Sequence, residues 1–275
     1  MQNLDRKTVA HFGKEWTRFS YQQRGLTDAA EMFNSYFGWL GDSFLNATWK
    51  AADFGCGSGR WAKLVAPHVR ELWCVDASEG ALAVAKTNLS ADGNCCFQQG
   101  VIGNLALPSE SFDFGYSLGV LHHIPDTEKA LRDCVRTLKR GGPFLVYLYY
   151  ALDNRPTWFR VLWRAADFGR KCVAVLPYPL KVVICDFIAV MVYWPLSRLA
   201  RFGYRMGRDI SNWPLSFYRD RSLYVLRTDA LDRFGTRLEK RFSKAQIQVL
   251  MEKCGLERIR FSVAPPYWVA IGWKA

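Results

Sequence analysis

Five short apolar runs alternate with helical patterns through the middle of the chain, residues 50–150. Strands are predicted at about 50–54, 71–76, 95–99, 111–117 and 143–150. Between them, apolar residues at helical spacing predict helices through about Val69, at 79–90 and at 127–139. Because strands that alternate with helices typically form a parallel sheet, this region is predicted to be an α/β domain.

The end of the chain adds more elements of the same kind. Ser243 begins a helical pattern that stops at Gly255, and the apolar runs 256–263 and 266–274 predict two further strands. The start of the chain is rich in aromatic side chains and predicts a helical cover. We therefore predict three parts: an N-terminal cover at 1–49, a core at 50–150 and 243–275, and an insertion at 151–242.

The insertion begins with an amphipathic helix, in which Arg160, Arg164 and Lys171 fall on one face. An apolar run at 182–194 follows, and Pro195 comes directly after it. The run contains Asp186 and is too short to cross a bilayer, and the chain has no uncharged apolar run of the length that a span needs.

Two interpretations of the insertion stay open. A helical lid that shapes an acceptor pocket is favoured as its main role. Residues 156–208 also suit an anionic membrane surface, because tryptophan and tyrosine end the apolar run and four arginines follow it. The two interpretations are compatible, since a lid that admits a lipid-linked substrate would itself be apolar and basic.

Charge is concentrated in the insertion. The chain of 275 residues carries a formal net charge of +12, and residues 151–242 hold 17 Lys and Arg against 8 Asp and Glu. The basic residues are interleaved with long apolar faces, which disfavours nucleic acid as a partner. Eight cysteines without metal-ligand spacing predict a protein of the reducing cytoplasm and no bound metal. Because of the insertion, peripheral attachment to the inner face of the membrane is a second expectation.

The candidate chemistry lies in a glycine-rich segment after the first predicted strand. Gly55, Gly57 and Gly59 alternate with small residues, which lets the backbone turn tightly and approach a ligand. Asp53, two residues before the first glycine, suits a cationic or amine-bearing ligand. Asp76 ends the second predicted strand 21 positions after Gly55, near the spacing at which a carboxylate meets ribose hydroxyls.

This segment resembles motif I of the class I S-adenosylmethionine-dependent methyltransferases, in their small-molecule (methyltransferase type 11-like) group. The resemblance implies a Rossmann-like, doubly wound sheet of seven strands with the last strand antiparallel. It also implies S-adenosylmethionine as the cofactor, and the following contact residues: Asp53, Gly55, Cys56, Gly57 and Gly59 for the methionine end, Asp76 and Ala77 for the ribose, Val101 and Ile102 for the adenine, and Ser117 and Leu118 beside the methionine part. The loop at 100–104 departs from the family, because it lacks the acid that usually meets the adenine amino group.

The pair His122–His123 follows the fourth predicted strand. Two adjacent histidines without a third ligand make a poor metal site, so a structural role is favoured over metal binding. General base catalysis is the alternative, and His122 is then the candidate because it is closer to the strand end.

These patterns predict an enzyme that methylates an oxygen or nitrogen of a small-molecule or lipid-linked acceptor. A membrane-surface binding protein that has kept the fold is the alternative from another class. An RNA methyltransferase is supported only by net charge.

Overall fold

The computed structural model describes residues 3–21 and 26–275. It divides into a core unit, Met1–Ala151 with Leu238–Ala275, and an insertion unit, Leu152–Arg237. The short segment 238–242, assigned to the insertion from the sequence, lies in the core unit.

The core unit contains a seven-stranded sheet in the order β3-β2-β1-β4-β5-β7-β6. Its strands are β1 (Lys50–Phe54), β2 (Glu71–Asp76), β3 (Cys95–Gln99), β4 (Phe114–Leu118), β5 (Pro143–Tyr147), β6 (Leu256–Phe261) and β7 (Val269–Lys274). The first five strands are parallel, and β7 runs antiparallel to β5 and to β6. The predicted fold class, including the antiparallel last strand, is confirmed.

Helices cover both faces of this sheet. They are α1 (Arg6–Arg18), α2 (Leu26–Phe37), α3 (Ala62–Val65), α4 (Glu79–Asn88), α5 (Thr127–Arg136) and α10 (Lys244–Lys253), with short 3-10 turns at Gly38–Leu40, Ala66–His68 and Leu121–His123. Side-chain caps fix where several of them begin: Asp5, Ser78 and Asp126 each accept a hydrogen bond from a backbone N–H of the first turn. Ser243 and Gln246 form a reciprocal capping box at α10.

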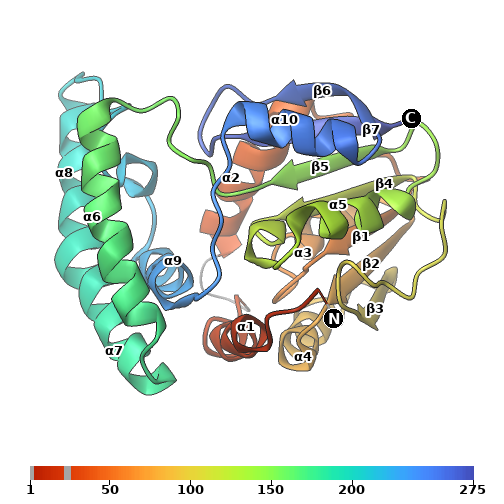
Figure 1. The fold of residues 1–275 in the computed structure, drawn as a ribbon, viewed down its shortest axis with the longest axis horizontal. Helices are drawn as coiled ribbons and strands as arrows, with labels where there is room; N and C mark the ends of the chain where they lie inside the picture. The colour runs from red at the N-terminus through yellow and green to blue at the C-terminus, as the bar shows by residue number, and fades with distance from the viewer. Residues whose placement is uncertain (1–2, 22–25) are drawn as a thin grey trace. The chain divides into compact units, whose positions relative to one another are not determined.

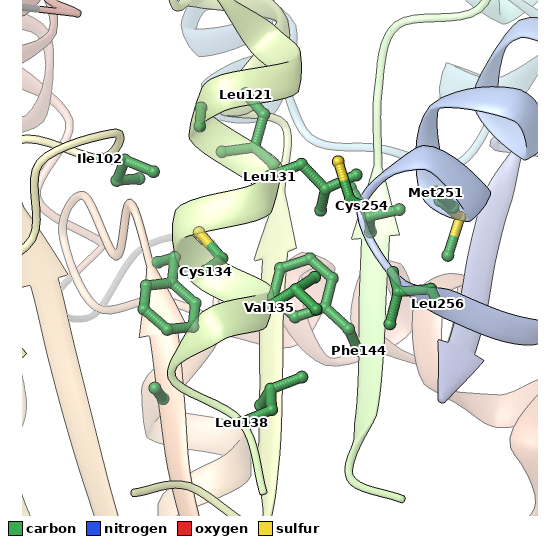
Figure 2. Packing of buried hydrophobic residues seen from close by; sticks show 14 of the residues in the cluster. Ile102, Leu121, Leu131, Cys134, Val135, Leu138, Phe144, Met251, Cys254 and Leu256 are labelled. Atoms are coloured by element: carbon green, nitrogen blue, oxygen red, sulfur yellow. The ribbon is translucent and has the colours of Figure 1, made fainter. Parts of the chain in front are cut away.

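The main hydrophobic core lies between the sheet and the helices α5 and α10 (Figure 1). Figure 2 shows Leu131 and Val135 of α5 facing Phe144 of β5, with Met251 and Leu256 beside them. On the opposite face of the sheet, Phe37 of α2 packs edge-on against Phe114 and Tyr116 of β4. Asp53 and Tyr116 are adjacent in the register of β1 and β4, so both point to this second face.

The insertion unit is helical. It contains α6 (Thr157–Ala174), α7 (Tyr178–Ile188), a π-helical turn (Ala189–Tyr193), α8 (Trp194–Arg205), a 3-10 turn (Ser216–Tyr218) and α9 (Leu223–Gly235). Within this unit α6 runs antiparallel to α7 and α8 (Figure 1).

The helix that contains the apolar run 182–194 is longer than the run and passes Pro195. The helix continues without a break from Tyr178 to Arg205 over 28 residues. Proline lacks an N–H and its ring crowds the preceding turn, and the wide π-helical turn immediately before Pro195 accommodates both defects. By length and composition alone this one helix of the described chain could cross a membrane, and 28% of its most apolar window is buried.

Candidate functional site

The glycine-rich loop follows β1 and adopts a backbone that side chains oppose. Gly55, Gly57 and Gly59 have φ angles of +87°, +54° and +76°, in the left-handed region. A Cβ at Gly57 would lie 2.8 Å from Trp16 Nε1 of α1, and one at Gly55 would lie 2.4 Å from Val120. The loop is therefore both strained for other residues and closely approached by its neighbours.

Hydrogen bonds tie this loop to the end of β2. The backbone N–H groups of Gly55 and Cys56 donate to the carbonyl of Val75, at 2.7 and 3.1 Å. Gly57 donates its N–H to Asp76 Oδ2 at 2.9 Å, and Ser78 donates to Asp76 Oδ1 at 2.8 Å. Each carboxylate oxygen can accept a second hydrogen bond, so Asp76 keeps capacity for a pair of ligand hydroxyls. Burial raises the pKa of Asp76.

Asp53 is the second-last residue of β1, close to this loop, and it is 1% exposed. Its Oδ2 atom accepts no hydrogen bond from the residues that the structure describes. Burial raises the pKa of Asp53 to about 8, the Tyr116 hydroxyl opposes the rise, and the negative charge of Asp76 adds to it. A buried carboxylate oxygen without a partner is costly unless a cation neutralises it, so this atom fits the amino group or sulfonium of a positively charged ligand.

The loop after β3 is held from the helix α5. Asp133 Oδ2 accepts hydrogen bonds from the N–H groups of Gly103 and Leu105, at 2.9 and 2.8 Å. Ile102 is buried and its side chain belongs to the main core (Figure 2), whereas Val101 is half-buried. Asp133 therefore holds the backbone of this loop, and the loop itself still lacks the acid that usually meets the adenine amino group.

Ser117 and Leu118 end β4 next to β1. The Ser117 hydroxyl is buried and donates to the carbonyl of Phe54 at 2.8 Å. This hydrogen bond holds the ends of β1 and β4 against each other. Because it occupies the Ser117 hydroxyl, the backbone of Ser117 rather than its side chain is available to a ligand. Ala77 lies between Asp76 and the cap of α4, and its carbonyl accepts from Gln99 Nε2 at 3.3 Å.

His122 is completely buried in the turn Leu121–His123. Its ring stacks on Tyr149 with a centroid separation of 3.9 Å and contacts the ring of His123 at 4.0 Å. His123 Nδ1 lies 2.6 Å from the carbonyl oxygen of Leu238, and its ring lies 5.0 Å from Phe12 of α1. The general base role of His122 stays a prediction.

Sequence reasoning missed the residues that α1 brings to this region. The Arg60 guanidinium lies over three rings, at 5.1 Å from Trp16, 5.2 Å from Tyr21 and 4.4 Å from Trp61. The buried pair His11 and Glu15, one helical turn apart, has a closest Nε2–Oε2 distance of 3.4 Å. Asp5 three residues before Thr8, at the start of an aromatic helical pattern, is the signal that could have found α1.

Among the described residues, no group of three or more His, Cys, Asp or Glu side chains could hold a metal ion.

The middle of the chain matches a family of known proteins. Residues 52–146 match the family described as "Methyltransferase domain". The chain is 36% identical over 107 residues to an uncharacterized methyltransferase, YcgJ, of Bacillus subtilis, a match that covers 38% of this chain and 42% of that protein. The chain therefore spans less than half of the length of that relative.

Two further comparisons extend over most of the chain. A ubiquinone biosynthesis O-methyltransferase of Azotobacter vinelandii is 24% identical over 242 residues, 80% of this chain and all of that protein. A crystal structure from Thermotoga maritima, described as a SAM-dependent methyltransferase and possible histamine N-methyltransferase, aligns with a TM-score of 0.53 at 17% identity. That alignment covers 96% of this chain and 100% of the other, and it supports the fold alone.

Proposed function

We propose that this chain, whose residues 52–146 match the family described as "Methyltransferase domain", is a class I S-adenosylmethionine-dependent methyltransferase that methylates a small-molecule or lipid-linked acceptor. The observation that carries this proposal is the buried Asp53 carboxylate, which has an oxygen without a hydrogen-bond partner among the described residues, beside a loop of three glycines in left-handed conformations. Asp76, hydrogen-bonded to the same loop, supplies the second carboxylate that the cofactor requires.

The residues present fit this cofactor in charge and shape. Asp53 neutralises its α-amino group, and Gly55, Cys56, Gly57 and Gly59 let the methionine end lie against the backbone. Asp76, with Ala77 beside it, accepts hydrogen bonds from the ribose hydroxyls. Val101 and the backbone of Ile102 border the adenine, and the backbone at Ser117 and Leu118 borders the methionine part.

When bound, S-adenosylmethionine supplies a methyl group on a sulfonium, which is already activated for displacement. The protein has to place the acceptor atom in line with that methyl group and exclude water. Positioning of this kind lowers a barrier by about 7–11 kcal/mol. For an oxygen acceptor a base is also needed, and a ring nitrogen of His122 takes the proton; an amine acceptor that binds in its neutral form needs none.

The insertion unit is the source of acceptor selectivity in this proposal. It lies outside the residues that match the family, and it carries the large apolar surface that a small hydrophobic or lipid-linked acceptor requires. The similarity to a ubiquinone biosynthesis O-methyltransferase supports an acceptor of that general class. In this proposal the enzyme acts in the cytoplasm or at the inner face of the membrane.

The test is transfer of label from S-adenosylmethionine carrying a tritiated methyl group. The protein is incubated in turn with a small-molecule extract, a lipid extract and total RNA, and the label is separated by organic extraction and by RNA precipitation. We expect label in the small-molecule or the lipid fraction, with Asp53→Asn as the inactive control. Label in RNA would overturn the acceptor class, and binding of vesicles without transfer to any fraction would favour the membrane-binding alternative.

A further inference from the structure

The insertion unit concentrates the exposed apolar side chains of the protein. Of the large apolar side chains that are exposed in the described chain, all but Val249 and Val263 lie within Leu152–Arg237. Phe168 is 74% exposed, Val183 65% and Phe187 63%. So many exposed apolar side chains in one unit are unusual for a protein in water and indicate a place where another apolar phase or molecule binds.

Many of these side chains lie on the long helix Tyr178–Arg205. Eight of them recur mostly at intervals of three or four residues, which places them along one side of a helix: Leu180, Val183, Phe187, Val190, Met191, Trp194, Leu199 and Phe202. The opposite side of the same helix is buried, and it packs on α9 through Cys185, Ala189 and Tyr193.

The two charged groups of α7 are directed to α9 and not to the exposed face. Lys181 Nζ donates a hydrogen bond to the carbonyl of Gly235 at 2.8 Å. Asp186 accepts two hydrogen bonds from the Arg227 guanidinium, both at 2.8 Å. The helix is therefore apolar on one side only, whereas a helix surrounded by lipid is apolar all round.

Basic residues gather at one end of the helical hairpin. Arg160 and Arg164 lie near the start of α6, and Arg205 and Arg208 lie at the end of α8 and just beyond it. Because α6 runs antiparallel to α7 and α8 (Figure 1), the two pairs lie at the same end, away from the turn at 175–177. All four are exposed, and none makes an ion pair with an acidic side chain of the described residues.

We propose that the exposed apolar face of α7 and α8 inserts into one leaflet of an anionic lipid membrane, with the arginines at this end of the hairpin at the level of the lipid phosphates. Exposed apolar side chains, two exposed tryptophans (Trp158 and Trp194) and arginines without an acidic partner among the described residues match the chemistry of a headgroup boundary. The one-sided apolarity favours insertion into one leaflet over a bilayer span, although the helix is long enough for one. The proposal does not rest on methyl transfer.

Co-sedimentation of the full chain with vesicles tests the partner. Vesicles of phosphatidylcholine are compared with vesicles of equal parts phosphatidylcholine and phosphatidylglycerol. We expect binding to the anionic vesicles that weakens as salt is added. Arg205→Gln and Arg208→Gln should each weaken binding about fivefold. Equal binding to both vesicle types, or none, would overturn the anionic membrane as the partner.

A matched pair of double variants tests the surface. Val183→Ser with Val190→Ser should weaken vesicle binding about tenfold, because both side chains lie on the proposed face. Val249→Ser with Val263→Ser changes the same atoms on the core unit and should leave binding unchanged. Equal effects of the two pairs would overturn the assignment. If light scattering shows a dimer, and only Val183→Ser with Val190→Ser converts it to a monomer, a second copy of the chain covers this face and the membrane is overturned as the partner.

Quenching by brominated lipids tests the depth. Bromine near the headgroup end of the acyl chain should quench tryptophan fluorescence more than bromine near the chain terminus, and Trp158→Phe with Trp194→Phe should lose this difference. Stronger quenching by the deep bromine would contradict insertion into one leaflet. Neither vesicle assay uses a methyl donor, so their failure and the failure of the proposed transferase activity are separate results.

Discussion

Replacing Asp53 by Asn is expected to stabilise the protein while abolishing cofactor binding. The carboxyl group is 1% exposed and one of its oxygens accepts no hydrogen bond from the described residues. Burial raises its pKa to about 8, so below that pH the folded protein keeps it protonated. An amide has no charge to desolvate, but it also cannot neutralise a cationic ligand.

The sign of the pH dependence follows from the two pKa values. In the unfolded chain Asp53 ionises near its ordinary value of about 4, whereas in the folded protein it ionises near 8. Between these values the unfolded state binds fewer protons, so the stability contributed by Asp53 is lost as pH rises from about 4 to about 8. The full difference corresponds to an upper limit of about 6 kcal/mol. Relaxation and water entry reduce such penalties, and we expect about 2–4 kcal/mol of stabilisation by Asp53→Asn at pH 8.

Urea unfolding between pH 5 and pH 9, without added cofactor, measures this effect. Asp113 provides a control of opposite sign. Burial acts to raise the pKa of Asp113, but hydrogen bonds from Lys139 and from the backbone N–H of Lys50 outweigh it and lower that pKa. Asp113→Asn should therefore be destabilising at every pH in this range, since the carboxylate contributes stability that is lost only when pH falls through its lowered pKa. If Asp53→Asn destabilises the protein, or if its pH profile is the same as that of the unsubstituted chain, the reasoning about Asp53 is wrong.

Three further substitutions test other parts of the site. Gly57→Ala places a Cβ 2.8 Å from Trp16 Nε1 at a φ of +54°, and thermal unfolding should show a loss of about 1–3 kcal/mol together with weaker cofactor binding in calorimetry. His122→Gln should lower kcat for an oxygen acceptor at least about 100-fold with unchanged cofactor affinity; a loss of stability with unchanged kcat would assign His122 a structural role. Arg60→Gln removes a guanidinium from three aromatic rings and should cost about 1–2 kcal/mol in urea unfolding, a loss that Arg60→Lys should partly restore if the charge matters.

The sheet could be predicted from the sequence because its signals are local. The strands β1, β2 and β3 have the predicted bounds, since each is a short segment between turn residues. The acids that end β1 and β2 lie at the same edge because parallel strands place their carboxyl ends together. The fourth strand begins later than predicted, because Phe112 forms only an isolated bridge with Leu138.

Features that depend on distant contacts could not be predicted. Nothing local indicates that Trp16 lies against Gly57, or that Asp133 of α5 holds the loop after β3. The continuation of the long helix through Pro195 depends on a π-helical turn that the apolar pattern does not signal. The missing acid in the loop at 100–104 indicated a departure from the family, but not the residue that anchors that loop.

Titration calorimetry of the full chain with S-adenosylmethionine tests the central claim most directly. The account predicts saturable binding at one site for S-adenosylmethionine and for its demethylated product, and no binding to Asp53→Asn. Retained folding of that variant, checked by its unfolding transition, assigns the loss to the carboxylate. Absence of heat from the unsubstituted protein at cofactor concentrations up to the millimolar range would contradict the assignment of this loop and its two carboxylates as the cofactor site.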